Sequence, residues 1–327
     1  MWRKLVICVL SAAVVGTGLT GCGQKEKTAE AVAASWTWEK PIQIICPWGA
    51  GGGSDLTARQ FAAALEKETG TPVQVKNIPG DNGLDGIRCF ANLPADGYTY
   101  LLGTQSPLVA QISKATDFDV FGTLHPLCQL VHDTNLFVTA SGSPYGNYQE
   151  LLDNLAANPG TVKCGVMSTT GLDEACVIAA FGDGIQLVDY NDGEILNRDV
   201  VNGTVQLACV GPAEISELVK SGTVKGILSC TSEKMTIDGF QDIDAAGEVG
   251  IDCDYGPARG LFYIEGTPPE AVAAMELVSQ KAVESESFQQ WASEQGLDQR
   301  EGWKNREDYT KDWDFVYKKI VELFDKK

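Results

Sequence analysis

The sequence predicts an α/β fold made of two doubly wound units, with the end of the chain returning to the first unit. Short apolar runs alternate with helical patterns from Pro41 onward, first over residues 41–104 and then over residues 136–230. Strands that alternate with helices of this length are typical of βαβ units around a parallel sheet. A further apolar strand near residue 258 leads into a run of helices that ends the chain.

The first unit begins with the strand-like run "IQIICP", which a glycine-rich loop joins to an amphipathic helix. Leu56, Phe61 and Leu65 of that helix share one face at α-helical spacing. The segments "IPGDNG" and "ADG" have the proline, glycine, aspartate and asparagine of turns. This unit is therefore expected to hold strands at 42–47, 73–77 and 98–104, and helices at 56–68 and 84–93.

The second unit repeats the same alternation, and the last part of the chain is mostly helical. Its expected strands are 136–142, 185–190, 205–211 and 224–230, with one more beginning at Val162. Its expected helices are 147–160, 172–182, 194–203 and 212–222. An apolar strand from Ala258 is followed by a Thr-Pro-Pro helix entry and by helices at 271–285, 288–296 and 307–324.

The first 22 residues have the pattern of a secretory signal. Arg3 and Lys4 form a short basic region, Leu5–Leu19 is apolar and uncharged, and "LTGC" ends the run. A leucine three places before a cysteine is typical of a bacterial lipoprotein signal, which is cleaved before the cysteine, here Cys22, and lipidated there. A plain transmembrane anchor is the alternative, but the apolar run is short for one.

These patterns set the expected domain boundaries. Residues 1–21 form the signal peptide, and residues 22–38 are polar, alanine-rich and without periodicity, which predicts a flexible tether. The first lobe is expected to take residues 39–138 and 258–327, and the second lobe residues 139–257.

The charge balance excludes nucleic acid as a partner. The chain has 25 Lys and Arg against 44 Asp and Glu, for a net charge of −19, and shows no cluster of cations that could neutralise phosphates. A composition that is 44% hydrophobic and 21% charged is that of a globular protein with a substantial core, and 327 residues suffice for two domains.

Eight cysteines follow Cys22. An even count in an exported protein suggests disulfides, but several of these residues lie in apolar strands, where a thiol behaves as a small buried hydrophobe. With two histidines and no C-x-x-C motif, the sequence has no zinc pattern. The prediction is therefore mostly free, buried thiols, at Cys46, Cys89, Cys128, Cys164, Cys176, Cys209, Cys230 and Cys253.

The segment "CPWGAGGGSDLTAR" joins the first strand to the first helix through five small residues, Gly49–Gly53. Glycines let a ligand approach the backbone amides at the positive end of the helix dipole, which favours an anion. A P-loop needs Lys-Ser/Thr where this chain has Ser54 and Asp55, and a dinucleotide fingerprint needs a glycine at Ser54. A clamp for a small carboxylate fits the loop better, and a tight turn without a ligand is the remaining alternative.

No convincing catalytic group is evident in the sequence. His125 and His132 lie beside proline or in loop-like sequence, and neither has an evident partner. At a helix N-terminus the pKa of Asp55 is expected to be lowered, which suits the carboxylate to bonding loop amides and fixing the glycine turn rather than to acting as a general base. We therefore expect no enzyme activity, no metal and no cofactor.

These motifs together resemble a known family. "KPIQIICPWGAGGGSDLTAR" is similar to the opening of the tripartite tricarboxylate transporter substrate-binding proteins, the Bug-type extracytoplasmic receptors. "VQVKNIPGDNGLDG", "LPADGYTYLLGT", "NPGTVKCGVMSTTG" and "ARGLFYIEGTP" resemble further motifs of that family. The likeness extends from Lys40 to the C-terminus, and its opening is its most specific part.

The resemblance implies a bilobed periplasmic-binding-protein-like fold of type II, with two α/β domains, a hinge and a ligand cleft between them. It implies a small organic carboxylate as ligand, with di- or tricarboxylates favoured, held by backbone amides and ordered waters. The residues expected to bind this ligand lie at strand ends and helix starts. They are Trp48, Gly49, Ala50, Gly51, Gly52, Gly53, Ser54, Asp55, Thr104, Ser106, Ser168, Thr169, Thr170, Gly171, Tyr190 and Arg259.

Three positions depart from the family pattern. Trp48 stands where the family often has phenylalanine, and Asn191 stands where a cation commonly follows the tyrosine that matches Tyr190. Arg259 lies where the family often has a tryptophan. A bidentate contact from Arg259 to a second ligand carboxylate and an ion pair at the surface or hinge are both open.

The resulting hypothesis is an extracytoplasmic receptor that is anchored to the bacterial cell membrane through a lipid on Cys22. The receptor would close around its ligand and deliver it to the permease subunits of a tripartite tricarboxylate-type transporter. A receptor of the same fold for an amino acid or an aromatic acid is the first alternative, and an extracytoplasmic enzyme acting on small acids is the second. The protein is expected to be a monomer.

Overall fold

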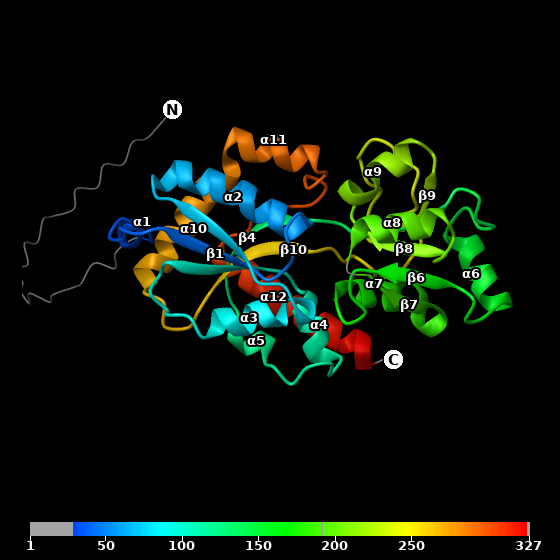
Figure 1. Cartoon of the computed structure of the whole chain (residues 1–327), viewed down its shortest axis with the longest axis horizontal. Coiled ribbons are helices and arrows are strands. Elements are labelled where there is room, and N and C mark those ends of the chain that lie inside the picture. The colour runs from blue at the N-terminus through cyan, green and yellow to red at the C-terminus, as the bar shows by residue number, and fades with distance from the viewer. Residues whose placement is uncertain (1–28, 191, 326–327) are drawn as a thin grey trace, which may run out of the picture.

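The computed structural model describes residues 29–190 and 192–325, which form two α/β lobes side by side (Figure 1). Each lobe contains one five-stranded sheet with helices packed on it. The bilobed α/β fold expected from the sequence is confirmed. The predicted signal peptide, Cys22 and Asn191 lie outside the described residues.

The first lobe is built on a sheet of order β2-β1-β3-β10-β4. Strands β2, β1 and β3 are parallel, with Ile44 beside Val75 and Tyr100, and β10 runs antiparallel to both of its neighbours. The strands are β1 (Ile42–Cys46), β2 (Val73–Asn77), β3 (Thr99–Gly103), β4 (His125–His132) and β10 (Ala258–Tyr263).

The second lobe has a sheet of order β7-β6-β8-β5-β9, in which β5 is the antiparallel strand. Its strands are β5 (Leu136–Ala140), β6 (Lys163–Val166), β7 (Gln186–Asp189), β8 (Leu207–Val210) and β9 (Val224–Ser229). The predicted boundary at 138/139 therefore falls inside β5.

Both sheets are mixed, whereas the sequence predicted parallel sheets. The antiparallel strands are the two by which the chain crosses from one lobe to the other: Leu136 at the start of β5 lies beside Val210, and Ala258 at the start of β10 lies beside His132. A chain that arrives from the opposite lobe enters at the carboxyl ends of the parallel strands. The strand that it forms must then run antiparallel to them, and an antiparallel strand pair needs no crossover helix.

Helices cover the sheets of both lobes. Those of the first lobe are α2 (Gly53–Thr69), α3 (Leu84–Ala91), α4 (Ser106–Ile112), α5 (Val120–Thr123), α10 (Pro269–Glu284) and α11 (Glu286–Glu294), with the 3₁₀ turn η1 (Asp81–Gly83). Those of the second lobe are α6 (Tyr148–Ala157), α7 (Leu172–Phe181), α8 (Gly193–Val201) and α9 (Pro212–Lys220), with η2 (Gly182–Gly184). None of the helices within the described ranges combines the length and apolar character needed to span a bilayer.

The C-terminal helix α12 (Arg306–Asp325) joins the two lobes, although the sequence assigned it to the first. Its first half buries Tyr309 and Trp313 in a first-lobe cluster, and Ile320 lies in the core of the second lobe. Val109 of α4 enters the same second-lobe core. Figure 1 shows α4 and α12 along one border between the lobes, with the C-terminus beside the second lobe. The lobes therefore share apolar packing on the side of α4, α7 and α12.

Part of the expected tether packs on the first lobe. Residues Ala29–Ala33 form a short helix, α1, and Ala33 is buried. Trp38 donates its indole N–H to the carbonyl of Gly97 at 3.0 Å, and Trp36 lies against Tyr98 with ring centroids 5.8 Å apart. These contacts tie the chain down before β1, so the flexible part predicted over residues 22–38 does not extend through this region.

The cysteines agree with the prediction of free, buried thiols. All eight from Cys46 to Cys253 are unpaired in the described chain, and only Cys89 is partly exposed. The histidines differ from expectation, because His125 and His132 begin and end β4 rather than lying in loops. Burial lowers the pKa of His132 to about 3, and the nearby Arg300 adds to this effect, so this imidazole is a neutral core group.

Candidate ligand-binding cleft between the lobes

The glycine loop leads directly from β1 into α2 at the boundary between the lobes. Gly52 is the N-cap of α2 with an extended backbone, and no side chain caps the helix. Gly51 has a φ of +83°, a conformation that glycine adopts without strain. A Cβ at Gly53 would lie 2.6 Å from Nη2 of Arg259, so glycine leaves room for that guanidinium. The loop thus presents bare backbone to the space in front of Arg259.

Asp55 holds this loop in place from behind. Its side chain is buried and accepts hydrogen bonds from the Gly51 amide at 2.9 Å, from Arg59 Nε at 2.9 Å and from Asn77 Nδ2 at 2.8 Å. Burial alone would raise the pKa of Asp55, but these three hydrogen bonds outweigh it and leave the pKa below its usual value. The expectation that Asp55 fixes the glycine turn is confirmed.

Arg259 is a buried cation at the start of β10, where the chain re-enters the first lobe. Its Nη2 lies 2.8 Å from Oδ2 of Asp133, and the two side chains are 8% and 12% exposed. Its Nε is buried without a hydrogen-bond partner. The hinge ion pair that the sequence left open is present, and the guanidinium keeps a donor that no group in the described part of the chain uses.

A cleft of about 230 Å³ lies in front of this ion pair and contains residues of both lobes. The first lobe contributes the glycine loop, the first turn of α2 and the end of α11, and the second lobe contributes the start of α9. The lining residues are Gly51, Gly52, Gly53, Leu56, Thr57, Asp133, Gly211, Ala213, Glu214, Arg259, Trp291, Gln295 and Leu297. The lining combines apolar side chains, two leucines and Trp291 among them, with three charged ones.

The second-lobe wall of the cleft was not predicted from the sequence. Gly211 is the N-cap of α9, and its amide donates to Oε2 of Glu214 at 2.9 Å. The side chain of Glu214 is exposed at the cleft, but the protein around it reduces the hydration of its carboxylate. This desolvation raises the pKa of the Glu214 carboxyl. The signal for this wall was a Gly-Pro pair between a strand and a helix, which is weaker than a glycine run.

The predicted second-lobe loop, Ser168–Gly171, lies against the first lobe and outside this cleft. Asn82 donates to the Thr170 carbonyl at 3.1 Å, and the amide of Leu172 donates to the hydroxyl of Ser106 at 3.4 Å. The Ser168 hydroxyl accepts from the Thr170 amide at 3.2 Å. The lobes therefore touch directly where the sequence predicted ligand contacts.

The remaining predicted residues lie apart from the cleft lining. Trp48 packs against Gly83, and its carbonyl accepts a hydrogen bond from Nδ2 of Asn77. Thr104 is buried and accepts from the amide of Ser106. Tyr190 donates its hydroxyl to Asp199 at 2.9 Å. Of the predicted ligand-binding residues, the structure brings only Gly51–Gly53 and Arg259 together in the cleft, and ligand contact by the others stays a prediction.

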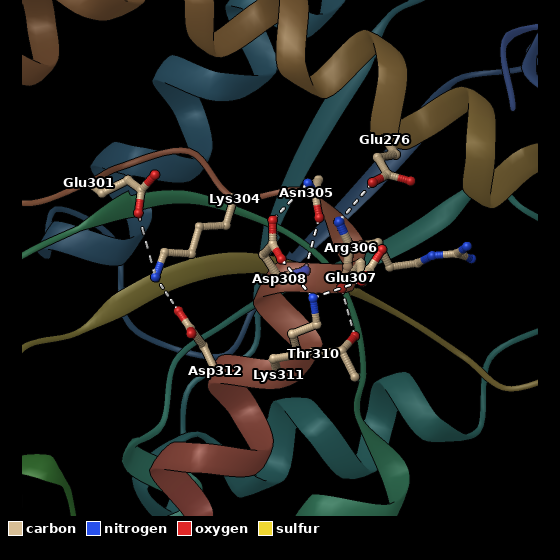
Figure 2. Close-up of polar contacts among 10 residues, drawn as sticks. All are labelled: Glu276, Glu301, Lys304, Asn305, Arg306, Glu307, Asp308, Thr310, Lys311 and Asp312. Atoms are coloured by element: carbon tan, nitrogen blue, oxygen red, sulfur yellow. Dashed lines mark hydrogen bonds and ion pairs between the residues drawn. The ribbon is translucent and has the colours of Figure 1, made fainter.

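A second hollow, of about 370 Å³, lies around the start of α12 (Figure 2). Lys304 is paired with Asp312 and, at 3.9 Å, with Glu301. Lys311 is paired with Glu307 at 2.7 Å and Asp308 at 3.1 Å. These ion pairs are local to the start of α12, and the amide of Arg306 donates to Oε1 of Glu276 in α10 at 2.7 Å, which attaches the start of α12 to the first lobe.

The described residues contain no cluster of three or more His, Cys, Asp or Glu side chains arranged to hold a metal ion. The cleft between the lobes offers electrostatic contacts. One buried guanidinium, two carboxylates and the backbone amides at the start of α2 border a space of small-molecule size.

A bilobed α/β fold with a small cleft between the lobes, lined in part by charged side chains, defines the class of periplasmic solute-binding proteins. Within that class, the chain belongs to the tripartite tricarboxylate transporter family of receptors, whose family model matches residues 57–312. This confirms the resemblance stated from the sequence motifs. Proteins of this family are extracytoplasmic receptors for solutes.

Individual relatives agree with this assignment. The chain is 25% identical over 292 residues to the protein BugT of Bordetella pertussis, covering 87% of each chain. It is similar in structure to MatC of Rhodopseudomonas palustris, which was solved with bound malate, at a TM-score of 0.75 and 18% identity over 87% of this chain and 99% of that one. An R. palustris protein solved with adipate gives a TM-score of 0.73 and 20% identity over 88% and 98% of the two chains.

Proposed function

We propose that this protein is a lipid-anchored solute receptor that binds a small organic carboxylate between Gly51–Gly53 and the start of α9. The observation that carries the proposal is Arg259, a buried guanidinium beside the glycine loop with an unused Nε donor. A carboxylate in the cleft would meet this cation and the amides at the start of α2, and charge-assisted hydrogen bonds of this kind are the strong ones.

The family and the fold support this ligand class. MatC and the adipate-binding protein of R. palustris, two structures with the same fold, hold small dicarboxylates. The cleft, at about 230 Å³, is below the usual range for drug-sized ligands and fits a small metabolite. Within this ligand class a di- or tricarboxylate is one candidate, and an amino acid or an aromatic acid, bound by a receptor of the same fold, is the first alternative to it.

Delivery to a membrane permease and anchoring through Cys22 complete the proposal. Ligand binding would draw the lobes together and present the closed form to the permease, because a ligand shifts the population toward the state that binds it better. The lipoprotein pattern at "LTGC" supports the anchor. Mass spectrometry of the N-terminal peptide tests it, and wild-type protein recovered from the membrane with its signal uncut and Cys22 unmodified would exclude the lipid.

Ligand binding is tested by thermal unfolding of the full-length protein, purified in detergent and freed of ligand by unfolding and refolding. Mono-, di- and tricarboxylates, amino acids and aromatic acids are then added singly. A ligand at a hundred times its Kd should add about 2.7 kcal/mol to the free energy of unfolding. Arg259→Gln should remove this shift. A refolded protein that responds to no acid would refute the ligand class, and turnover of a bound acid would favour an enzyme.

A further inference from the structure

The cleft holds one more acidic group than its cation neutralises. Its charged lining residues are Asp133, Glu214 and Arg259. Asp133 is already paired with Arg259 at 2.8 Å. Glu214 has no ion-pair partner among the described residues, since its only hydrogen bond there is from the Gly211 amide to Oε2. The walls of the cleft therefore carry a net negative charge.

The two carboxylates converge on one small space above Gly211. A Cβ built on that glycine would lie 3.6 Å from Oδ2 of Asp133 and 3.6 Å from Oε2 of Glu214. Like charges held this close repel each other. Burial, followed by the proximity of Asp133, raises the pKa of Glu214. A cation placed between the carboxylates would relieve this repulsion.

The first-lobe wall of the cleft favours negative charge. The amides of Gly52 and Gly53 are at the start of the 17-residue helix α2 and donate to no group in the described chain, whereas the Gly51 amide is used by Asp55. Arg259 lies beside Gly53. A carboxylate would bind at this wall, and a group of opposite charge a few bonds away would face Glu214 and Asp133.

We propose that the cleft selects a zwitterion, an α-amino acid, over the hydroxy acid or dicarboxylate of the same carbon skeleton. The inference rests on the proposed function and names its ligand more closely. The α-carboxylate lies against Gly52, Gly53 and Arg259, and the ammonium group lies between Asp133 and Glu214. A second ligand carboxylate placed in the ammonium position would meet two anions, so the site rejects it by repulsion.

Pairs of acids that differ only in an amino or a hydroxyl group test this proposal directly. Calorimetry on the ligand-free, full-length protein in detergent at pH 8 compares L-alanine with L-lactate, L-aspartate with L-malate, and L-glutamate with L-2-hydroxyglutarate. In the pair whose skeleton fits, the amino acid should bind at least about tenfold tighter. Tighter or equal binding of the hydroxy acid would overturn the proposal.

Glu214→Gln removes the unpaired charge, and Glu217→Gln on the exposed face of the same helix is the matched control. Glu214→Gln should weaken binding of the amino acid about tenfold while leaving the hydroxy acid unchanged or tighter, and Glu217→Gln should change neither. An equal loss for both members of the pair would make Glu214 a structural residue and overturn the assignment.

The two proposals fail in different ways. Binding of dicarboxylates or hydroxy acids with no preference for amino acids refutes the zwitterion and leaves the carboxylate receptor intact. Absence of binding for all six acids and for succinate and citrate refutes both.

Discussion

Gly52 is the residue at which the cleft is most easily blocked. Its backbone, with φ −78° and ψ 166°, is allowed for any residue, and a Cβ there would have no neighbour nearer than the Gly49 carbonyl at 3.9 Å. Gly52→Val should therefore abolish ligand binding measured by calorimetry. Its cost in the free energy of unfolding should be about 1 kcal/mol, because valine is a poor N-cap.

Gly49→Val is the control for this substitution. A Cβ at Gly49 also enters open space, but the residue does not line the cleft. Binding should persist in this variant. Wild-type affinity in Gly52→Val would show that the ligand occupies another part of the boundary between the lobes.

Asp173 makes a prediction about pH. Its oxygens accept from the amide of Met167 at 2.9 Å and from Asn135 at 3.0 Å, while burial raises the pKa of the carboxyl to about 7. The unfolded carboxyl ionises near pH 4, so between pH 4 and 7 the folded state holds a proton that the unfolded state has released. Asp173 therefore lowers stability as pH rises through this window, by at most about 1.4 kcal/mol per pH unit.

Asp173→Asn should cancel this slope. Denaturant unfolding from pH 4 to 8 should show the variant gaining stability relative to wild type as pH rises. Asp183→Asn, at an exposed position, corrects for the loss of one negative charge. A difference between wild type and Asp173→Asn that does not change with pH would mean that the Asp173 carboxyl ionises normally.

Individual residues also show what the sequence could and could not predict about the cleft. The role of Asp55 followed from local sequence, because its partner Gly51 is four positions away. Asp133 follows β4 and Glu214 follows β8, two strands of different sheets, and the weak Gly-Pro pair before Glu214 is the one local signal that the sequence gives for either residue. Arg259 was found through the family motif, but its partner Asp133, 126 positions away, was not.

At the scale of elements, the strands and helices with clear periodicity were predicted, and the two crossing strands were assigned the wrong direction. The apolar runs of β5 and β10 identify strands, but direction depends on which sheet edge the chain enters. Strand β4 was missed because Pro126 and the two histidines hid its alternation, although Leu127, Cys128 and Leu130 are buried.

Helix α12 makes a prediction at this scale, since its two halves belong to different lobes. Ile320 is fully buried in the second-lobe core, whereas Phe315 on the same helix is 63% exposed. Ile320→Ala should lower the free energy of unfolding by about 2–4 kcal/mol through the cavity it leaves, and Phe315→Ala should change it by less than about 0.5 kcal/mol. Urea titrations measure both. Equal effects would mean that the end of α12 does not support the second lobe.

At the scale of the whole molecule, the two lobes repeat one topology. Each sheet has its three parallel strands at one side, followed by the antiparallel crossing strand and then an outer strand. Helices α2 and α9 each begin where a parallel strand ends, and their starts line the cleft, while Arg259 and Asp133 lie where the chain crosses between the lobes. The cleft thus results from how the strands and helices are connected. Few of the 35 glycines in the sequence line it.

The same geometry predicts how the lobes move. On the side of α4, α7 and α12 they share a continuous apolar core, which cannot open without exposing Val109 and Ile320. On the opposite side the boundary is a cleft between α11 and α9. Closure should therefore pivot on the shared core and bring α9 toward α11, as packed cores resist deformation while unpacked boundaries move.

Spin labels on the exposed residues Glu217 of α9 and Glu294 of α11 report this motion. The distance between them should shorten when a bound acid is added. Labels at the exposed residues Lys114 and Asp252 form the control pair. They lie within two positions of Ile112 and Ile251, which pack against the shared core, so their separation should stay constant. A change in the control pair as large as that between α9 and α11 would mean that the shared core separates. The pivot would then have to lie in the two crossing segments, next to Asp133 and Arg259.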